Sequence, residues 1–195
     1  MGPPGSGKGT QASQLAKKLG MGSVSSGDLF RDHRRRETQL GKLVKSYMDR
    51  GDYVPDDVTI RMVIDWIHEP LHVNGFVLDG FPRTQLQAKA LDEALSGGEG
   101  IDRVLFIGVS ESELIRRLTG RLVCRKCQTP YHLHSSPPRR ESVCDDCGGE
   151  LYQREDDIAE VVTNRIQIYS RETKPGVDYY CASGKLREVD GEAPI

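Results

Sequence analysis

The first residues of the chain combine closely spaced glycines with one lysine. Residues 2–10 read GPPGSGKGT, which is the spacing GxxxxGK with a threonine displaced by one further glycine. Glycines allow a tight backbone turn whose N–H groups converge on one anion. Lys8 adds a positive charge, and a helix that begins there adds the partial charge of its N-terminus. The segment predicts a loop that binds nucleotide phosphates; the alternative is a flexible turn that binds nothing.

Four of the five cysteines form two CxxC pairs that predict a metal site. Cys124 and Cys127 are separated from Cys144 and Cys147 by residues 128–143, which is zinc-ribbon spacing. Four thiolates fill a tetrahedral shell and leave no position for water, so we expect structural zinc. The alternative is a pair of disulfides, which a reducing compartment disfavours.

Alternating helices and strands must position these two groups of residues. Apolar residues recur at helical spacing in 10–19 and 158–169, and Ser110 with Glu113 predicts a capping box at the start of another helix. Strands are expected around Val24 and at 76–78, 104–109 and 186–189. The run 76–78 reads as fully buried. Strands separated by helices indicate an α/β fold with a parallel sheet.

The composition is that of an ordinary water-exposed domain. The 195 residues are 36% hydrophobic and 29% charged, with a formal net charge of -2. This length allows one core with small inserts. The charge balance gives no reason to expect a nucleic acid or membrane partner, and no apolar run is long enough to span a bilayer. The N-terminus lacks the apolar region of a signal peptide, so we expect a cytoplasmic protein.

Four motifs in order resemble those of bacterial adenylate kinases. They are GPPGSGKGTQA at 2–12, SSGDLFR at 25–31, GFVLDGFPRT at 75–84, and the two CxxC pairs. The resemblance covers nearly the whole chain and implies reversible transfer of a phosphoryl group, ATP + AMP = 2 ADP, with Mg²⁺. It also implies a P-loop core of 1–24, 55–117 and 158–195, an AMP-binding insert at 25–54 (the flap) and a zinc-binding insert at 118–157 (the lid).

The resemblance also assigns roles to single residues. For catalysis it implies Lys8, Arg83, Arg121, Arg154 and Arg165. For ATP it implies Gly5, Ser6, Gly7, Lys8, Gly9, Thr10, Arg117, Arg121, Tyr131 and Ala193. For AMP it implies Ser26, Arg31, Val54, Gly80, Arg83, Gln87, Arg154 and Arg165, with Asp79 holding Mg²⁺ through water. Arginine suits this chemistry because its planar fork meets phosphate oxygens in pairs.

The two ends of the chain depart from the family pattern. The family carries a short apolar strand before the phosphate loop, where only Met1 precedes Gly2, and continues into a final helix beyond Ile195. A strand missing from the sheet would leave its neighbours without backbone partners. We therefore expect the gene product to start upstream and end later, and the chain as given to be marginally stable and weakly active.

Other functions compete with this interpretation. The nearest is a kinase for another nucleoside monophosphate, against which Gln87 and the four-cysteine lid argue. A second is a nucleotide-binding remnant without turnover. A third is a zinc ribbon that binds nucleic acid, but no basic stripe with stacking aromatic residues accompanies the cysteines. We expect ATP, AMP and ADP as partners and a monomeric protein.

Overall fold

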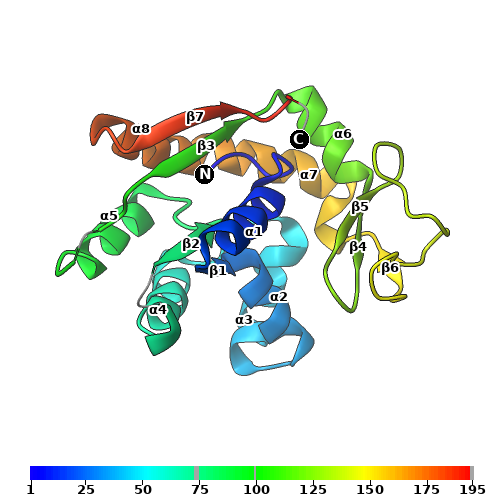
Figure 1. Ribbon diagram of the computed structural model, residues 1–195, viewed down its shortest axis with the longest axis horizontal. Coiled ribbons are helices and arrows are strands. Elements are labelled where there is room, and N and C mark those ends of the chain that lie inside the picture. The colour runs from blue at the N-terminus through cyan, green and yellow to red at the C-terminus, as the bar shows by residue number, and fades with distance from the viewer. Residues whose placement is uncertain (73–74, 99, 194–195) are drawn as a thin grey trace.

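The computed structural model describes residues 1–193 except 73–74 and 99. Helices and short strands alternate along the chain, as Figure 1 shows. The strands of the core are β1 (Gly22–Ser25), β2 (Phe76–Asp79), β3 (Val104–Gly108) and β7 (Leu186–Asp190). The helices of the core are α1 (Lys8–Leu19), α4 (Asp56–Ile67), α5 (Gln85–Ala94), α6 (Glu111–Thr119), α7 (Ala159–Ile168) and α8 (Lys174–Ala182). The predicted helices and strands are thus confirmed, with shifts of a few residues at their ends.

The core strands pair in parallel, as expected for an α/β fold. β1 runs beside β2 with Ser25 opposite Asp79, and β3 runs beside β7. The single sheet expected from the sequence is instead divided into two pairs among the described residues. Full burial of 76–78 was a wrong prediction, because β2 has a strand partner on one edge only and its residues stay partly exposed. Met1 joins the edge of β3, its carbonyl accepting from the Ile107 N–H at 3.0 Å.

Apolar clusters hold the helices of the core against the strands and against one another, and two of these clusters border the polar residues described below. One unites α4 with α5 and Phe81, and contains Val63, Ile67 and Leu91. The other joins α6 to α7 through Leu114, Leu118, Val162 and Ile166. Each fully buried aliphatic side chain contributes about 2 kcal/mol to the free energy of unfolding. These clusters hold the helices that carry the polar residues described below.

The start of α6 differs from the predicted capping box. The Ser110 side chain makes no cap hydrogen bond, and its backbone N–H donates to Glu192 Oε1 at 2.7 Å. Glu113 instead accepts from Arg116 and Arg117, each with an N–O distance of 2.7 Å. Two guanidinium groups three and four residues along the helix outcompete a backbone N–H for one carboxylate. The predicted capping box is therefore wrong.

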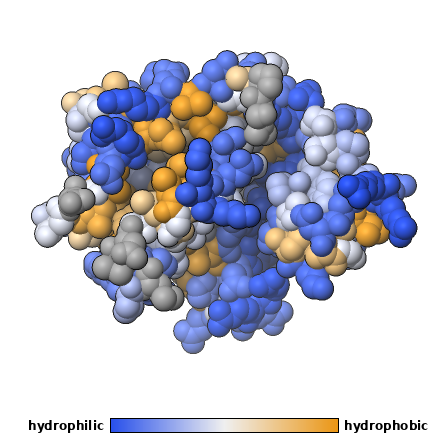
Figure 2. Space-filling model, in the orientation of Figure 1, coloured by the Kyte–Doolittle hydropathy of each residue, from blue (hydrophilic) through white to orange (hydrophobic). Residues whose placement is uncertain are grey.

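Two inserts leave the core. The flap is a helical hairpin of α2 (Ser26–Arg35) and α3 (Gln39–Arg50), in which the Ser25 and Thr38 hydroxyls cap the two helices. The lid holds an antiparallel sheet of β4 (Arg121–Cys124), β5 (Pro130–His132) and β6 (Leu151–Tyr152), with β4 in the middle. In Figure 1 the lid lies beyond α6, on the side away from α5 and α8. Figure 2 shows a hydrophilic outer surface over α2 and α3.

No helix among the described residues is both long and apolar enough to cross a membrane.

Candidate active site

The glycine-rich segment forms a tight loop that leads into α1. Gly5 and Gly7 have φ angles of 83° and 89°, which favour glycine, and Gly7 is the N-cap of the helix. A Cβ atom on Gly5 would lie 2.8 Å from Leu118 Cγ, so the loop also sits tightly on α6. Lys8 Nζ donates to the Pro3 carbonyl at 2.7 Å. Burial lowers the pKa of Lys8 to about 8, against the attraction of Asp79.

A carboxylate faces this loop from the end of β2. Asp79 Oδ1 is buried and has no hydrogen-bond partner among the described residues. Its other oxygen would lie 3.3 Å from a Cβ atom on Gly9. A buried carboxylate oxygen without a donor, next to a phosphate loop, fits the hydration shell of a bound Mg²⁺. The Ser25–Asp79 register places the start of α2 beside this carboxylate.

One cavity of about 610 Å³ joins these elements. The predicted site residues on its wall are Gly5, Gly7, Lys8, Gly9, Thr10, Arg31, Asp79, Gly80, Arg83, Arg117, Arg121, Arg154 and Arg165. Ser6 is buried, and its hydroxyl oxygen lacks a partner among the described residues. Residues 127–130 of the lid complete the wall. A concentration of positive side chains in one cavity suits a ligand with several phosphates.

Two of the arginines share one buried acid, Asp157. Arg121 donates to both of its oxygens, at 2.8 and 2.6 Å, and Arg165 Nη1 donates at 2.9 Å. The Asp157 side chain is fully buried, so the geometry of both guanidinium groups is fixed. No binding or catalytic role of Asp157 is predicted from the sequence. It stands in the acidic run 155–157, which gives no hint of the partner 36 residues away.

Arg154 has a weaker partner. Its Nε is buried without a hydrogen-bond partner among the described residues, and its Nη2 lies 3.9 Å from Asp28. Burial lowers the pKa of Arg154 to about 10. Burial would raise the pKa of Asp28, but Arg31 outweighs it and the pKa is lowered. Arg154 therefore keeps donors available for an anion in the cavity.

A second cavity of about 70 Å³ opens beside the flap. Ser26, Val54 and Gln87 line it together with Arg83. The hydroxyl of Ser26 and the Nε of Arg83 both donate to the Gly80 carbonyl at 2.7 Å. Gln87 accepts from the Arg83 N–H at 2.8 Å and donates to Asp56 at 2.7 Å. Its amide keeps one N–H and one lone pair for a ligand.

Besides Ser6, two predicted nucleotide-binding residues line neither cavity. The Tyr131 side chain is buried in the lid, where its hydroxyl accepts from the Asp145 N–H at 2.7 Å. Ala193 is exposed near the end of the chain. Tyr53 and Thr173, which the sequence analysis did not single out, do line the large cavity. The one sequence signal for Tyr53 is its position next to Val54, a predicted AMP-binding residue.

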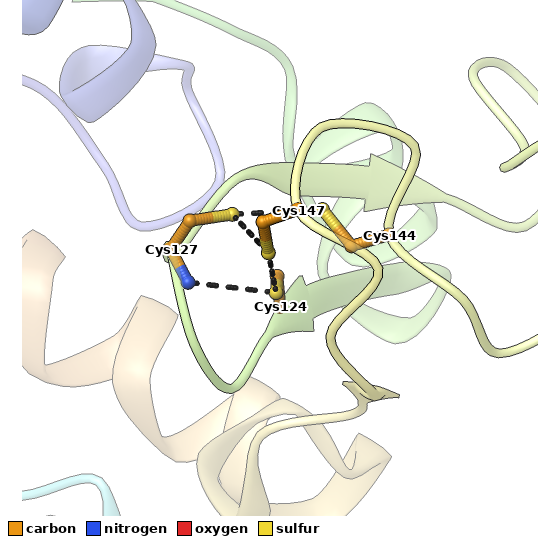
Figure 3. Close-up of side chains that lie close together, drawn as sticks. All are labelled: Cys124, Cys127, Cys144 and Cys147. Carbon is orange, nitrogen blue, oxygen red and sulfur yellow. Dashed lines mark hydrogen bonds between the residues drawn. The ribbon is translucent and has the colours of Figure 1, made fainter.

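The four cysteines of the CxxC pairs come together in the lid. Their Sγ atoms all lie within 4.8 Å of one another. Figure 3 shows the Cys127, Cys147 and Cys124 thiols side by side, with Sγ–Sγ distances of 3.3 Å for Cys127–Cys147 and 3.5 Å for Cys124–Cys147. The Cys127 N–H also donates to Cys124 Sγ at 3.5 Å. These spacings are longer than a disulfide bond and a few tenths of an ångström shorter than the edges of a zinc–thiolate tetrahedron with Zn–S bonds of about 2.3 Å.

Comparisons with known proteins identify the family of the chain. A model of the adenylate kinase family matches residues 1–185. A curated adenylate kinase of Streptomyces avermitilis is 51% identical over 100% of this chain and 90% of its own length. The adenylate kinases of Carboxydothermus hydrogenoformans and Staphylococcus aureus are each 50% identical over 100% of this chain, covering 92% and 91% of their own lengths. The family match and the similarity along the whole chain show that this chain belongs to the adenylate kinase family.

Proposed function

We propose that this chain transfers a phosphoryl group between ATP and AMP, forming two ADP, with the residues of the large cavity as its machinery. The observation that supports these roles most directly is a single cavity holding Lys8, Asp79 and a set of arginines. Phosphoryl transfer spreads negative charge over several oxygens, so it needs positioned cations and no nucleophilic side chain. The activity itself is that of the family.

The donor nucleotide occupies the phosphate loop. The N–H groups of residues 5–10 surround its phosphates, and Lys8 places a positive charge against them. Arg117 and Arg121 close the lid side of this subsite. Arg121 is held by Asp157, so it meets the transferring group in a fixed orientation. Tyr131 and Ala193 lie off the cavity wall in this structure and have no part in this proposal.

The acceptor nucleotide lies between the flap and the end of β2. Arg31, Arg83, Arg154 and Arg165 surround the position of its phosphate. Ser26, Val54 and Gln87 line the small cavity, where its base and sugar lie, and Gly80 lines the neighbouring wall of the large cavity. The remaining N–H and lone pair of Gln87 can read the edge of an adenine.

Mg²⁺ and zinc have separate sites. Asp79 would hold Mg²⁺ through water, and the ion would neutralise charge on the donor phosphates. Cys124, Cys127, Cys144 and Cys147 would hold zinc, which would stabilise the fold of the lid. The antiparallel sheet supports a lid at 118–157, and the helical hairpin supports a flap at 25–54. Both inserts border the large cavity, so their closure would exclude water from the reaction.

We also propose a monomeric cytoplasmic enzyme without a nucleic acid partner. Grouped cysteines suited to metal point to a reducing compartment. The formal net charge of -2 gives no electrostatic attraction to nucleic acid. Light scattering at micromolar protein concentration tests the monomer.

The deciding experiment measures ADP formation from ATP, AMP and Mg²⁺. Activity with AMP that is about a hundredfold weaker with CMP or UMP supports the acceptor site described here, and the reverse preference identifies another nucleoside monophosphate kinase. Arg83→Ala should abolish most of the activity. Arg103→Ala is the matched control, because Arg103 is exposed and its side chain, among the residues the structure describes, donates only to the neighbouring Asp102 carbonyl. A folded, zinc-loaded sample without turnover would contradict the proposal.

A further inference from the structure

Tyr53 makes two separate contacts in the loop between α3 and α4. Its ring faces the guanidinium group of Arg83, with 5.1 Å between the ring centroid and Arg83 Cζ. Its hydroxyl shares a hydrogen bond with Thr173 Oγ1 at 2.8 Å. The residue also lines both cavities. The aromatic face thus acts on one partner and the hydroxyl on another.

Arg83 is held by two hydrogen bonds, one from its side chain and one from its backbone. Its Nε donates to the Gly80 carbonyl, and its backbone N–H donates to Gln87. Neither terminal nitrogen of Arg83 has a hydrogen-bond partner among the described residues. A cation is attracted to an aromatic face, so the Tyr53 ring fixes the plane of the guanidinium group. The two terminal nitrogens then remain for an anion in the cavity.

Thr173 is a rigid support for Tyr53. It ends the π-helix Tyr169–Thr173 between α7 and α8, and it is 3% exposed. The loop that carries Tyr53 is also attached to α7, since Asn164 Nδ2 donates to Asp52 Oδ1 at 3.2 Å and to the Arg50 carbonyl at the end of α3 at 2.7 Å. The end of the flap is therefore attached to the α7–α8 region at two points. Tyr53 has little freedom to move away from Arg83.

We propose that Tyr53 is a positioning residue that orients Arg83 toward the phosphate of the acceptor nucleotide, with Thr173 holding Tyr53 in place. This inference rests on the proposed role of Arg83 in binding that phosphate. The ring of Tyr53 sets the orientation, and its hydroxyl limits how far the ring can move. Loss of the ring therefore weakens AMP binding more than loss of the hydroxyl.

The test is the dissociation constant for AMP, measured by titration calorimetry, which needs no turnover. Tyr53→Leu should raise this constant about fivefold, the effect of one partly desolvated cation–π contact. Tyr53→Phe keeps the ring and should raise it less than about threefold, and Thr173→Val should match Tyr53→Phe. The dissociation constant for ATP should stay within about twofold in all three variants, because none of them alters the phosphate loop.

A double-mutant cycle separates positioning from other roles. In an Arg83→Ala background, Tyr53→Leu should add nothing, because its effect passes through Arg83. Additive effects would show that Tyr53 contacts the nucleotide itself and would overturn the inference. An unchanged AMP constant in Tyr53→Leu, with a raised one in Arg83→Ala, would also overturn it while leaving the proposed function intact. An unchanged constant in Arg83→Ala would contradict the proposed function instead. Should Tyr53→Leu fail to fold, Tyr53→Phe and Thr173→Val decide: a rise in the AMP constant of about twofold in both, with the ATP constant unchanged, supports the inference, and no rise in either overturns it.

Discussion

The flap and the lid are two inserts in one core, and they are stabilised in different ways. The flap surrounds an apolar cluster of Phe30, Val44 and Val54, to which α4 adds partly buried side chains. The apolar cluster inside the lid consists of Cys124, Tyr131, Cys144 and Leu151, of which two are proposed zinc ligands. The flap thus shares an apolar cluster with α4, whereas the stability of the lid depends on its cysteines. An insert that projects from the body needs an internal crosslink when it cannot share a core.

Metal removal should give the largest difference between the two inserts. Structural zinc in small domains contributes on the order of 10 kcal/mol to folding. Chelation, or Cys144→Ser, should therefore remove hydrogen-exchange protection from lid amides in β4 and β5 while α2 and α3 stay protected. Phosphoryl transfer from ATP should fall together with this protection, because Arg121, a proposed ATP-binding residue, is the first residue of β4.

Cys181→Ser is the matched control, since Cys181 is exposed and lies outside the cluster. It should leave zinc content and lid exchange unchanged. Equal loss of protection in the flap and the lid after chelation would refute the comparison.

A structural feature could be predicted from the sequence when the residues that form it belong to one recognisable local pattern. The phosphate loop, the cysteine cluster and most helices follow from residues close together in the chain, and these predictions are confirmed as structure. Asp157 could not be found this way, because its partner Arg121 is far along the sequence. The Tyr131 side chain packs in the small apolar cluster of the lid, and the local sequence pattern does not indicate that this cluster needs a large side chain. The binding roles of the site residues stay predictions.

A substitution at a crowded backbone position in the flap should give the second largest loss of stability. A Cβ atom on Gly41 would lie 2.2 Å from the His33 carbonyl oxygen, where α3 crosses α2. Neither backbone can yield without separating the hairpin, so Gly41→Ala should destabilise the protein by about 3 kcal/mol. Urea unfolding measures this change. Gly97→Ala is the control, because nothing lies within 4 Å of a Cβ atom there. A neutral Gly41→Ala would show that the hairpin packing is looser than described.

Truncation in the flap cluster should have a smaller effect that zinc does not influence. Val44 is completely buried, and Val44→Ala removes two methyl groups, which costs about 2 kcal/mol. The loss should be the same in zinc-loaded and chelated protein, as measured by exchange of α2 and α3 amides. Leu43→Ala, one residue earlier and half exposed, should change little. A Val44→Ala effect that appears only without zinc would mean that the lid supports the flap.

The smallest effect concerns the cap of α3. Thr38 Oγ1 accepts from the Gly41 N–H at 3.0 Å, which satisfies one of the free donors at the helix start. Thr38→Ala should cost about 1 kcal/mol by urea unfolding. Ser112→Ala on the exposed face of α6 removes a hydroxyl outside any cap and should cost nearly nothing. A destabilisation by Thr38→Ala that exceeds that of Val44→Ala would show that capping stabilises the flap more than its apolar cluster does. The strands β4, β5 and β6 of the lid have no such caps. The difference in stability between flap and lid would then come from the helix caps of the flap.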